Sequence, residues 1–339
     1  MDTLRRLRGA NNEGVLVAVI LVVVIAMALA SPAFFTPSTF FGLVRSSLVP
    51  LVFALGVLLI MISGGIDVSF PAIAIFAAYT TVAWSTEASF DPTLVGIFAI
   101  ALLIGAAWGL LNGLVIARFR LPTLIVTLGT QGVIKGILLT YIGSTYISAG
   151  RLPASVGDAG NAHLVDIPGA GYLHGMMVPV VVIALLVWWM LTYTTFGRSV
   201  YAIGGDIEAA RRVGIKVVRT QVLLYVLVGA LAAFGGVVYV ILGRNANPQT
   251  LVGTELDIIA AVVLGGASIF GGRGSVGGTV LGVLLVQLIN NNLVLIGIPS
   301  TWQRAAVGLL LIIGVSVQAL AAVRRRRQPV VIEEEVGAA

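Results

Sequence analysis

A short polar segment interrupts a long apolar part of this chain and limits what the chain can fold into. Residues 63–69, Ser-Gly-Gly-Ile-Asp-Val-Ser, lie inside an otherwise apolar stretch from Leu48 to Trp84. An unpartnered polar group in hydrocarbon costs several kcal/mol, so such groups face a bundle interior or an aqueous path. The segment predicts a membrane protein with a broken helix, and it makes Asp67 and Ser69 candidates for lining a polar path.

The same segment has a second interpretation. About 19 residues separate Ser46 from Gly64 and Gly65, which is close to the length of one membrane span. The segment would then be a tight turn between two spans, with Asp67 as the N-cap of the second. Pro71 favours a helix start or a kink in either case. The two interpretations are compatible, because an N-cap can also border a path.

The composition agrees with a membrane protein. Hydrophobic residues make up 58% of the 339 residues and charged residues only 10%, whereas soluble domains carry about 25% charged residues. Apolar runs of spanning length predict an all-α fold with about ten transmembrane helices, at 15–34, 46–64, 66–85, 94–117, 121–142, 177–194, 220–242, 256–271, 276–297 and 303–323. Arg5, Arg6 and Arg8 before the first run also fit a secretory signal, but the many later spans favour a retained helix.

The basic residues set the expected orientation. With ten spans both termini lie on one side, and the positive-inside rule places that side in the cytoplasm. Of the 20 Lys and Arg residues, Lys135 falls within a span and four lie on the outer side: Arg45, Arg151, Arg244 and Arg304. The remaining fifteen fall on the cytoplasmic side: Arg5, Arg6, Arg8, Arg118, Arg120, Arg198, Arg211, Arg212, Lys216, Arg219, Arg273 and Arg324 to Arg327. The positive charge therefore serves orientation and anionic lipid rather than nucleic acid.

Residues 1–328 are predicted to form a single transmembrane domain with two hydrophilic loops, followed by a tail without fixed structure at 329–339. The loop at 143–176 is expected in the periplasm and the loop at 195–219 in the cytoplasm. The inner loop predicts a short helix, with Asp206 as N-cap, Glu208 in the first turn and Gly214 at the end. The small-residue pair Gly105 and Gly109 predicts close helix packing within one subunit rather than a dimer contact.

Several amides and one tryptophan are further candidates for the path. Amides both donate and accept hydrogen bonds, as recognition of sugar hydroxyls requires. The alternatives are hydrogen bonding between helices for the amides and an interfacial position for the tryptophan. The candidates beside Asp67 and Ser69 are Asn112, Gln131, Asn290, Asn291, Trp302 and Gln303.

The sequence lacks the residues that metal-binding, catalytic or nucleotide-binding sites require. The chain has no cysteine and only two histidines, His163 and His174, both in the outer loop without a partnered nucleophile, so neither a metal site nor a catalytic residue is expected. The glycine-rich run 265–275 lacks the Gly-Lys-Ser/Thr ending of a phosphate-binding loop. It predicts a turn between two spans, and no cofactor site is expected.

Three stretches carry a resemblance to a known family. They are Ser-Gly-Gly-Ile-Asp-Val-Ser at 63–69, Gly-Arg-Ser-Val-Tyr-Ala-Ile-Gly-Gly-Asp-Ile-Glu-Ala-Ala-Arg-Arg-Val-Gly-Ile at 197–215, and the run from Leu256 to Thr279 that contains Gly-Gly-Ala-Ser-Ile-Phe-Gly-Gly-Arg-Gly-Ser. The chain resembles the membrane permease subunits of ribose-type bacterial ABC sugar importers over nearly its whole length. It departs after Asp67, where Ser-Phe-Pro-Ala replaces the usual Ser-Val-Gly-Ser.

The resemblance implies a non-enzymatic subunit of an importer in the bacterial inner membrane. Such an importer pairs two permease subunits, identical or homologous, with two cytoplasmic ATPases that use ATP and Mg and with a periplasmic sugar-binding protein. The inner loop matches the element that docks on the ATPase, which implies coupling roles for Gly197, Arg198, Gly205, Asp206, Glu208, Ala209, Ala210, Gly214 and Ile215.

The resemblance implies a monosaccharide or related polyol as the cargo. Few charges lie within the spans, chiefly Asp67 and Lys135, so the path suits a neutral polar cargo better than an ion. A nucleoside or autoinducer permease of the same superfamily is the first alternative. An ion-coupled secondary transporter is the remoter one, since membrane-buried carboxylates are few.

Overall fold

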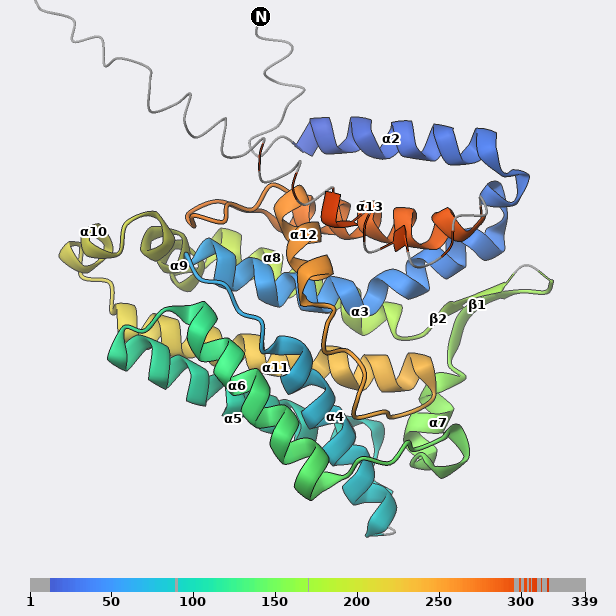
Figure 1. Cartoon of the computed structure of the whole chain (residues 1–339), viewed down its shortest axis with the longest axis horizontal. Coiled ribbons are helices and arrows are strands. Elements are labelled where there is room, and N and C mark those ends of the chain that lie inside the picture. Colours follow the sequence, from blue (N-terminus) through green and yellow to red (C-terminus); the bar gives the residue numbers. More distant parts are fainter. Residues whose placement is uncertain are drawn as a thin grey trace, which may run out of the picture.

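The computed structural model describes residues 13–88, 91–169 and 171–295, together with single positions between 299 and 316. The predicted tail at 329–339, the Arg324 to Arg327 cluster and most of the tenth apolar run lie outside the described residues. The described chain is mostly helical (Figure 1). Its elements, in order, are α2 (Glu13–Ala30), η1 (Pro32–Phe35), α3 (Pro37–Ile62), α4 (Phe70–Glu87), α5 (Leu94–Phe119), α6 (Thr123–Ile137), η2 (Leu138–Ile142), η3 (Ala149–Arg151), α7 (Ala154–Gly160), β1 (His163–Ile167), β2 (Gly171–His174), α8 (Met177–Tyr193), α9 (Thr195–Gly205), α10 (Ile207–Arg212), α11 (Val217–Gly243), α12 (Glu255–Leu264) and α13 (Val276–Leu295).

In the described part of the chain a helix overlaps each of the first nine predicted apolar runs, and α3 begins nine residues earlier than predicted, at Pro37. Five of these helices, α3, α5, α6 with η2, α11 and α13, are long and apolar enough to cross a membrane, and the bent pair α8–α9 raises that number to six. A mostly helical fold with five to six candidate membrane spans is thus confirmed. The number ten and the cytoplasmic position of the termini stay predictions.

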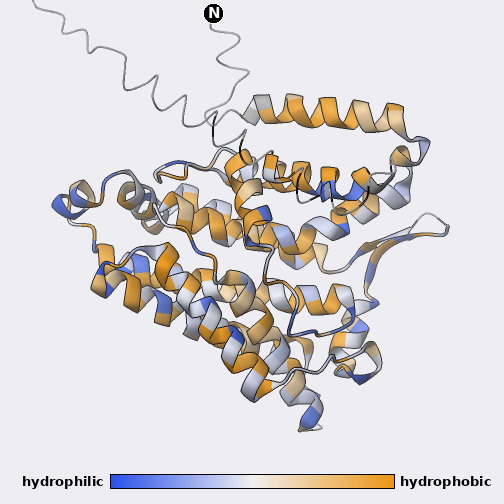
Figure 2. Cartoon of the chain, viewed as in Figure 1, coloured by the Kyte–Doolittle hydropathy of each residue, from blue (hydrophilic) through white to orange (hydrophobic). Residues whose placement is uncertain are grey.

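Two ends of the bundle are useful landmarks. In Figure 1, α9 and α10 lie at the left, which we call the α10 end, and β1, β2 and α7 lie at the right, which we call the hairpin end. Helices α3, α8, α11 and α13 run between them. Hydrophobic residues cover α2 and much of the other long helices, and hydrophilic residues gather at α10 (Figure 2). This pattern is expected for helices that lie in lipid.

The core forms around α3, α4 and α11. Most of α3 from Ser47 to Ile62 is buried, as is nearly all of α4. Helix α11 packs most extensively against α5. A Cβ placed on Gly105 would lie 2.3 Å from the carbonyl oxygen of Gly229, and one placed on Gly109 would lie 2.2 Å from that of Tyr225. The prediction that this glycine pair packs within one subunit is confirmed.

The polar segment 63–69 breaks the helical path, as predicted. Gly64 takes a positive φ of 87° after the end of α3, and helix does not resume until Phe70. Ser69, rather than Asp67, occupies the N-cap position of α4. The interpretation of Asp67 as N-cap is wrong because its carboxylate accepts hydrogen bonds from Ser69 instead of capping the first turn of α4.

The predicted outer loop contains structure that the all-α prediction did not include. Strands β1 and β2 pair as an antiparallel hairpin, with His163 opposite His174 and Ile167 opposite Gly171. Only part of this loop is solvated, since His174 is 1% exposed. A two-stranded hairpin adds no sheet core of its own, so the fold class becomes mostly helical rather than all-α.

The predicted inner loop holds two helices instead of one. Helix α9 follows α8 after a bend of 72°. Gly197 makes this bend possible, because a Cβ there would lie 2.4 Å from the carbonyl oxygen of Met190. The Thr194 hydroxyl caps α9 by accepting a hydrogen bond from Gly197 N at 3.1 Å. Helix α10 follows directly, where the sequence predicts it.

Candidate functional site

A cavity of about 430 Å³ opens at the hairpin end. Four helices and a loop wall it: the first half of α3, the last turns of α11, the start of α12 and the middle of α13. Its lining mixes apolar surface with hydroxyl, amide and charged groups, as small-molecule sites do. The lining residues are Gly42, Arg45, Ser46, Val49, Pro50, Phe53, Tyr239, Leu242, Gly243, Leu251, Thr254, Asp257, Ile258, Gln287 and Asn290.

We call the cavity at the hairpin end the outer cavity. Neutral groups bind its one arginine, Arg45. Arg45 donates to the Tyr172 hydroxyl at 3.0 Å and to the carbonyl oxygen of Leu242 at 2.6 Å. Its guanidinium also lies 5.7 Å from the centre of the Tyr172 ring. Arg45 therefore ties α3 to strand β2 and to the end of α11 at the mouth of the cavity.

The amides of α13 differ in what they contact. Asn291 donates to the Ser46 hydroxyl at 2.6 Å, and Gln303 donates to the backbone carbonyl of Asn290 at 2.7 Å. The side-chain oxygen of Asn290 is buried and has no hydrogen-bond partner among the described residues. Asn290 thus forms part of the wall of the outer cavity, and its side-chain oxygen is buried in that wall without a partner in the described part of the chain.

Asp67, Ser69 and Asn112 form a buried hydrogen-bond network. One carboxylate oxygen of Asp67 accepts from the Ser69 backbone N–H and hydroxyl, both at 2.7 Å. Asn112 donates to the Ser69 hydroxyl at 3.0 Å and accepts from the Thr130 hydroxyl at 2.7 Å. The network fastens the 63–69 break to α5 and α6.

The network borders neither of the two cavities described here. Asp67 is 2% exposed, and Ser69 and Asn112 are fully buried. Backbone contacts add to the attachment, since Ile66 N donates to the Thr123 hydroxyl at 2.9 Å. The arrangement holds the break in place, and a lining role for these three residues stays a prediction.

The remaining predicted path residues are spread over the structure. Gln131 donates to Glu255, whose other carboxylate oxygen accepts from Gly253 N at 2.8 Å. This contact joins α6 to α12 beside Thr254 of the outer cavity. Trp302 is 63% exposed, as an interfacial tryptophan would be.

A second cavity, of about 290 Å³, lies at the α10 end. The polar break forms one wall, and the end of α9 with the start of α10 forms another. Thr123 of α6, two positions of α11 and Phe270 complete the lining. Its lining residues are Ser63, Gly64, Gly65, Thr123, Ile203, Gly204, Gly205, Asp206, Ile207, Gln221, Tyr225 and Phe270.

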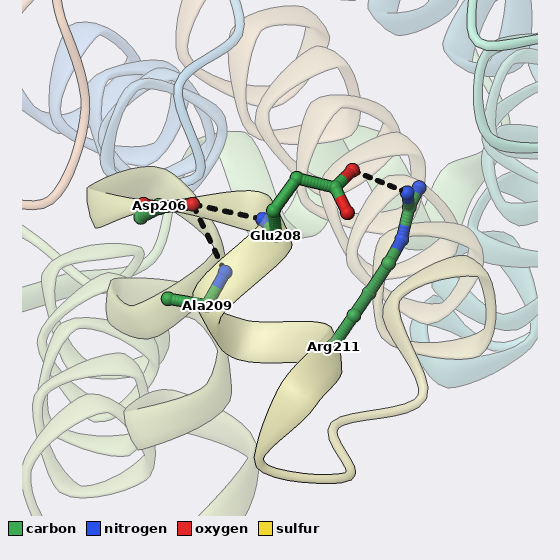
Figure 3. Close-up of polar contacts among 4 residues, drawn as sticks. All are labelled: Asp206, Glu208, Ala209 and Arg211. Carbon is green, nitrogen blue, oxygen red and sulfur yellow. Dashed lines mark hydrogen bonds and ion pairs between the residues drawn. The ribbon is translucent and has the colours of Figure 1, made fainter.

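Helix α10 has the caps that the sequence predicts. The Asp206 carboxylate accepts from Glu208 N at 2.9 Å and Ala209 N at 3.0 Å (Figure 3). These backbone donors lower the pKa of Asp206 below its ordinary range. Arg211 pairs with Glu208 at 2.6 Å, also drawn in Figure 3. Gly214 ends the helix with a positive φ of 86°.

The residues with implied coupling roles divide into two groups. Arg198, Gly205, Asp206, Glu208, Ala209 and Gly214 are exposed at the α10 end. Gly197 is buried at the α8–α9 bend, while Ala210 packs with Ile203 and Val217 and is joined there by Ile215. The exposed face also presents Val213, which is 76% exposed and was missed by sequence reasoning.

His174 is a buried titratable group at the hairpin end. Its Nδ1 accepts from Met176 N at 3.1 Å, and its Nε2 lies 3.4 Å from the Gly160 carbonyl oxygen. Burial lowers the pKa of His174 below its ordinary value of 6.5. The unfolded segment binds a proton that the folded one does not, so stability is complete above about pH 6.5 and falls as the pH drops below it.

We therefore expect residues 160–176 to open more readily at pH 5.5 than at pH 7.5. Amide hydrogen exchange, corrected for intrinsic rates, measures this opening. A His174→Asn variant keeps an acceptor for Met176 N but cannot titrate, so its opening should change less between the two pH values. An equal change in both proteins would contradict the assignment to His174.

Comparison with known proteins identifies the family. Residues 38–315 match the family model described as the permease component of branched-chain amino acid transport systems. The chain belongs to this permease family. It is a multi-pass membrane permease of a bacterial ABC importer, so the predicted class, the membrane location and the non-enzymatic role are confirmed. No solved structure matches the chain significantly.

Curated relatives of this permease include ribose and autoinducer permeases. The ribose import permease protein RbsC of Escherichia coli K12 is 32% identical over 301 residues, which cover 88% of this chain and 91% of the relative. RbsC of Bacillus subtilis 168 is 36% identical over 87% of this chain and 88% of the relative. The autoinducer 2 import system permease protein LsrC of Yersinia pseudotuberculosis YPIII is 32% identical over 89% of this chain and 83% of the relative.

Of the eight predicted path residues, Asn290 lines the outer cavity of the permease. Sequence reasoning missed Arg45, Asp257 and Gln287, which line it as well. These residues come from three helices far apart in the sequence. A charge inside or beside an apolar run was the available signal for Arg45 and Asp257, and an amide inside the run 276–297 was the signal for Gln287.

Proposed function

We propose that this permease forms the translocation path for a neutral sugar, a monosaccharide or polyol, in an ATP-driven importer supplied by a periplasmic binding protein. The outer cavity carries the proposal. Hydroxyls of a sugar both donate and accept hydrogen bonds, and the cavity offers both kinds of partner. Its volume of about 430 Å³ falls within the usual range of small-molecule sites, about 300–1,000 Å³.

The charges of the outer cavity favour a neutral ligand over an ion. One cation, Arg45, and one carboxylate, Asp257, line it. Arg45 already donates to two neutral oxygens, so part of its donor capacity is used within the protein. The polar groups left for a ligand include the amides Gln287 and Asn290. The Thr254 hydroxyl donates to the Leu251 carbonyl oxygen at 2.7 Å and can still accept.

Packed residues separate the two cavities, as transport by alternating access requires. Phe53 contacts Phe70 with ring centres 5.4 Å apart, and Gly56 packs on Val228. Along α11, Tyr225 of one cavity and Tyr239 of the other are 14 residues apart, or about 21 Å of helix. Passage from one cavity to the other would require this packed layer of α3 and α11 to part.

The α10 end is the proposed docking site for a cytoplasmic ATPase that uses ATP and Mg. Its exposed helix α10 has a rigid cap and an apolar residue, Val213, that a groove on a partner could hold. The excess of basic residues on the same side supports the proposed cytoplasmic position of this end and of both termini. Residues 1–328 would then form one membrane domain of ten spans, paired with a second permease subunit.

A second ligand class has specific support. LsrC relatives match as much of the chain as the ribose permeases do, so an autoinducer is the alternative cargo and a nucleoside a further one. Membership of the ABC permease family argues against the ion-coupled secondary transporter.

The decisive experiment is reconstitution of the permease with its ATPase and binding protein in liposomes. Uptake of labelled pentoses, hexoses, polyols, autoinducer 2 and nucleosides would be measured with ATP and with a non-hydrolysable analogue. We expect ATP-dependent uptake of a monosaccharide or polyol. Uptake of nucleosides alone, or uptake that ignores ATP, would refute the proposal.

Replacing Asn290 by leucine tests the role of the outer cavity. The change removes the unpartnered acceptor from the cavity wall, and a lost hydrogen bond with a ligand costs about 1 kcal/mol or more. We expect sugar uptake to fall roughly tenfold. Asn161→Leu, at an exposed amide outside both cavities, is the matched control. Equal uptake by the two variants would remove Asn290 from the path.

A further inference from the structure

Three glycine-containing segments meet in direct backbone contact at the α10 end. Gly272, in the loop between α12 and α13, donates to the Ile62 carbonyl oxygen at the end of α3 at 2.9 Å. A Cβ placed on Gly204 of α9 would lie 1.7 Å from that same oxygen and 2.8 Å from Gly272 N. No side chain fits between these segments, so α9, the end of α3 and the loop touch through their backbones.

Further contacts close the same junction. A Cβ placed on Gly271 would lie 2.5 Å from the Gly204 carbonyl oxygen and 2.8 Å from the Gly64 Cα. The Tyr201 hydroxyl of α9 donates to the Gly274 carbonyl oxygen at 2.7 Å. We call this set of contacts the glycine joint: Ile62, Gly64, Tyr201, Gly204, Gly271, Gly272 and Gly274.

The glycine joint is tightly packed, whereas a cavity lies beside α10. The inner cavity of about 290 Å³ lies beside it, bounded by residues 63–65 and 203–207. A shift of α9 and α10 as a unit would change the volume of this cavity. Flexible side chains would absorb a small displacement, whereas backbone in close contact passes it on, because packed protein interiors are barely compressible.

We infer that the glycine joint transmits movement of α9 and α10 to the 63–69 break, with Gly204 as the positioning residue. The inference rests on the proposed docking of an ATPase at α10. The break is fastened on its other side to α5 and α6 by the Asp67–Ser69–Asn112 network. A displacement of α9 would therefore reach residues 63–69, which connect α3 to α4. This segment lies between the inner cavity and the packed residues that separate the two cavities.

The test compares Gly204→Ala with Gly277→Ala in liposomes that hold the full importer. Gly277 lies in the first turn of α13, where an added Cβ meets nothing within 4 Å. The measurements are co-purification of the ATPase, ATP hydrolysis and sugar moved per ATP. For Gly204→Ala we expect the ATPase to bind and hydrolyse while sugar moved per ATP falls at least tenfold. Gly277→Ala should match the wild type.

Tyr201→Phe keeps the test decisive if Gly204→Ala does not assemble. It removes only the hydrogen bond to Gly274, and we expect sugar moved per ATP to fall about threefold with unchanged ATPase binding. If Gly204→Ala assembles, wild-type coupling in both variants would overturn the role of the glycine joint and leave the proposed function standing. If Gly204→Ala does not assemble, wild-type coupling in Tyr201→Phe would do the same. Absence of ATP-dependent uptake by the wild type would instead overturn the proposed function and the joint with it.

Discussion

Replacing Gly109 by alanine is expected to prevent α5 from packing on α11. The new Cβ would lie 2.2 Å from the Tyr225 carbonyl oxygen and 2.9 Å from its carbonyl carbon. Both atoms belong to helix backbone, which cannot move aside as a flexible side chain can. Overpacking a well-packed core costs about 1–3 kcal/mol and sometimes more. We expect a loss of about 3 kcal/mol or more here, because α11 makes its most extensive contacts with α5.

Gly132→Ala is the matched control for this experiment. Gly132 lies in α6, where an added Cβ meets nothing within 4 Å. Alanine is about 1 kcal/mol better than glycine in a helix, so this variant should be as stable as the wild type or more so. Thermal unfolding in detergent, followed by size-exclusion chromatography, measures both. Equal melting temperatures for the two variants would show that α5 and α11 do not pack as closely as described.

Replacing Asp67 by leucine is expected to release the 63–69 break. The change leaves the Ser69 N–H without its acceptor and removes one partner of the Ser69 hydroxyl. Each buried polar group left unpaired costs about 1–3 kcal/mol, so we expect a loss of at least about 2 kcal/mol. Asp67→Asn keeps an acceptor oxygen at the same place, and its stability should lie close to that of the wild type.

Uptake by the asparagine variant then separates two roles of Asp67. If the carboxyl group serves to hold the break, a stable Asp67→Asn protein should transport normally. Loss of uptake at wild-type stability would instead support the predicted place of Asp67 in the path. A leucine variant as stable as the asparagine variant would contradict the network itself.

Local features were predictable where neighbouring residues decide them. The cap of α10 depends on Asp206 and the two backbone N–H groups that follow within three residues. The break after α3 depends on Gly64 and its positive φ. The four-residue spacing of Gly105 and Gly109 puts them on one helix face, so close packing followed.

The outer cavity could not be predicted in the same way. Arg45, Tyr239, Asp257 and Gln287 belong to four different helices, and only the packing of those helices brings them together. For the same reason, the surroundings of Asp67 and Ser69 could not be predicted, although their polar groups suggested that they line a path. Asn112 and Thr130 on other helices complete the network of hydrogen bonds. Its residues line neither cavity.

The sequence alone determined that this chain is a membrane protein, that helix is interrupted at 63–69, and that the loop 195–219 carries a capped helix. These properties depend on the hydrophobicity and the backbone preferences of nearby residues. Tertiary structure alone decided which polar groups share a cavity and which satisfy one another. It also brought Ile62, Gly204 and Gly272 into contact. Such contacts depend on how helices distant in the chain pack together, and the spacing of residues within one helix does not determine that packing.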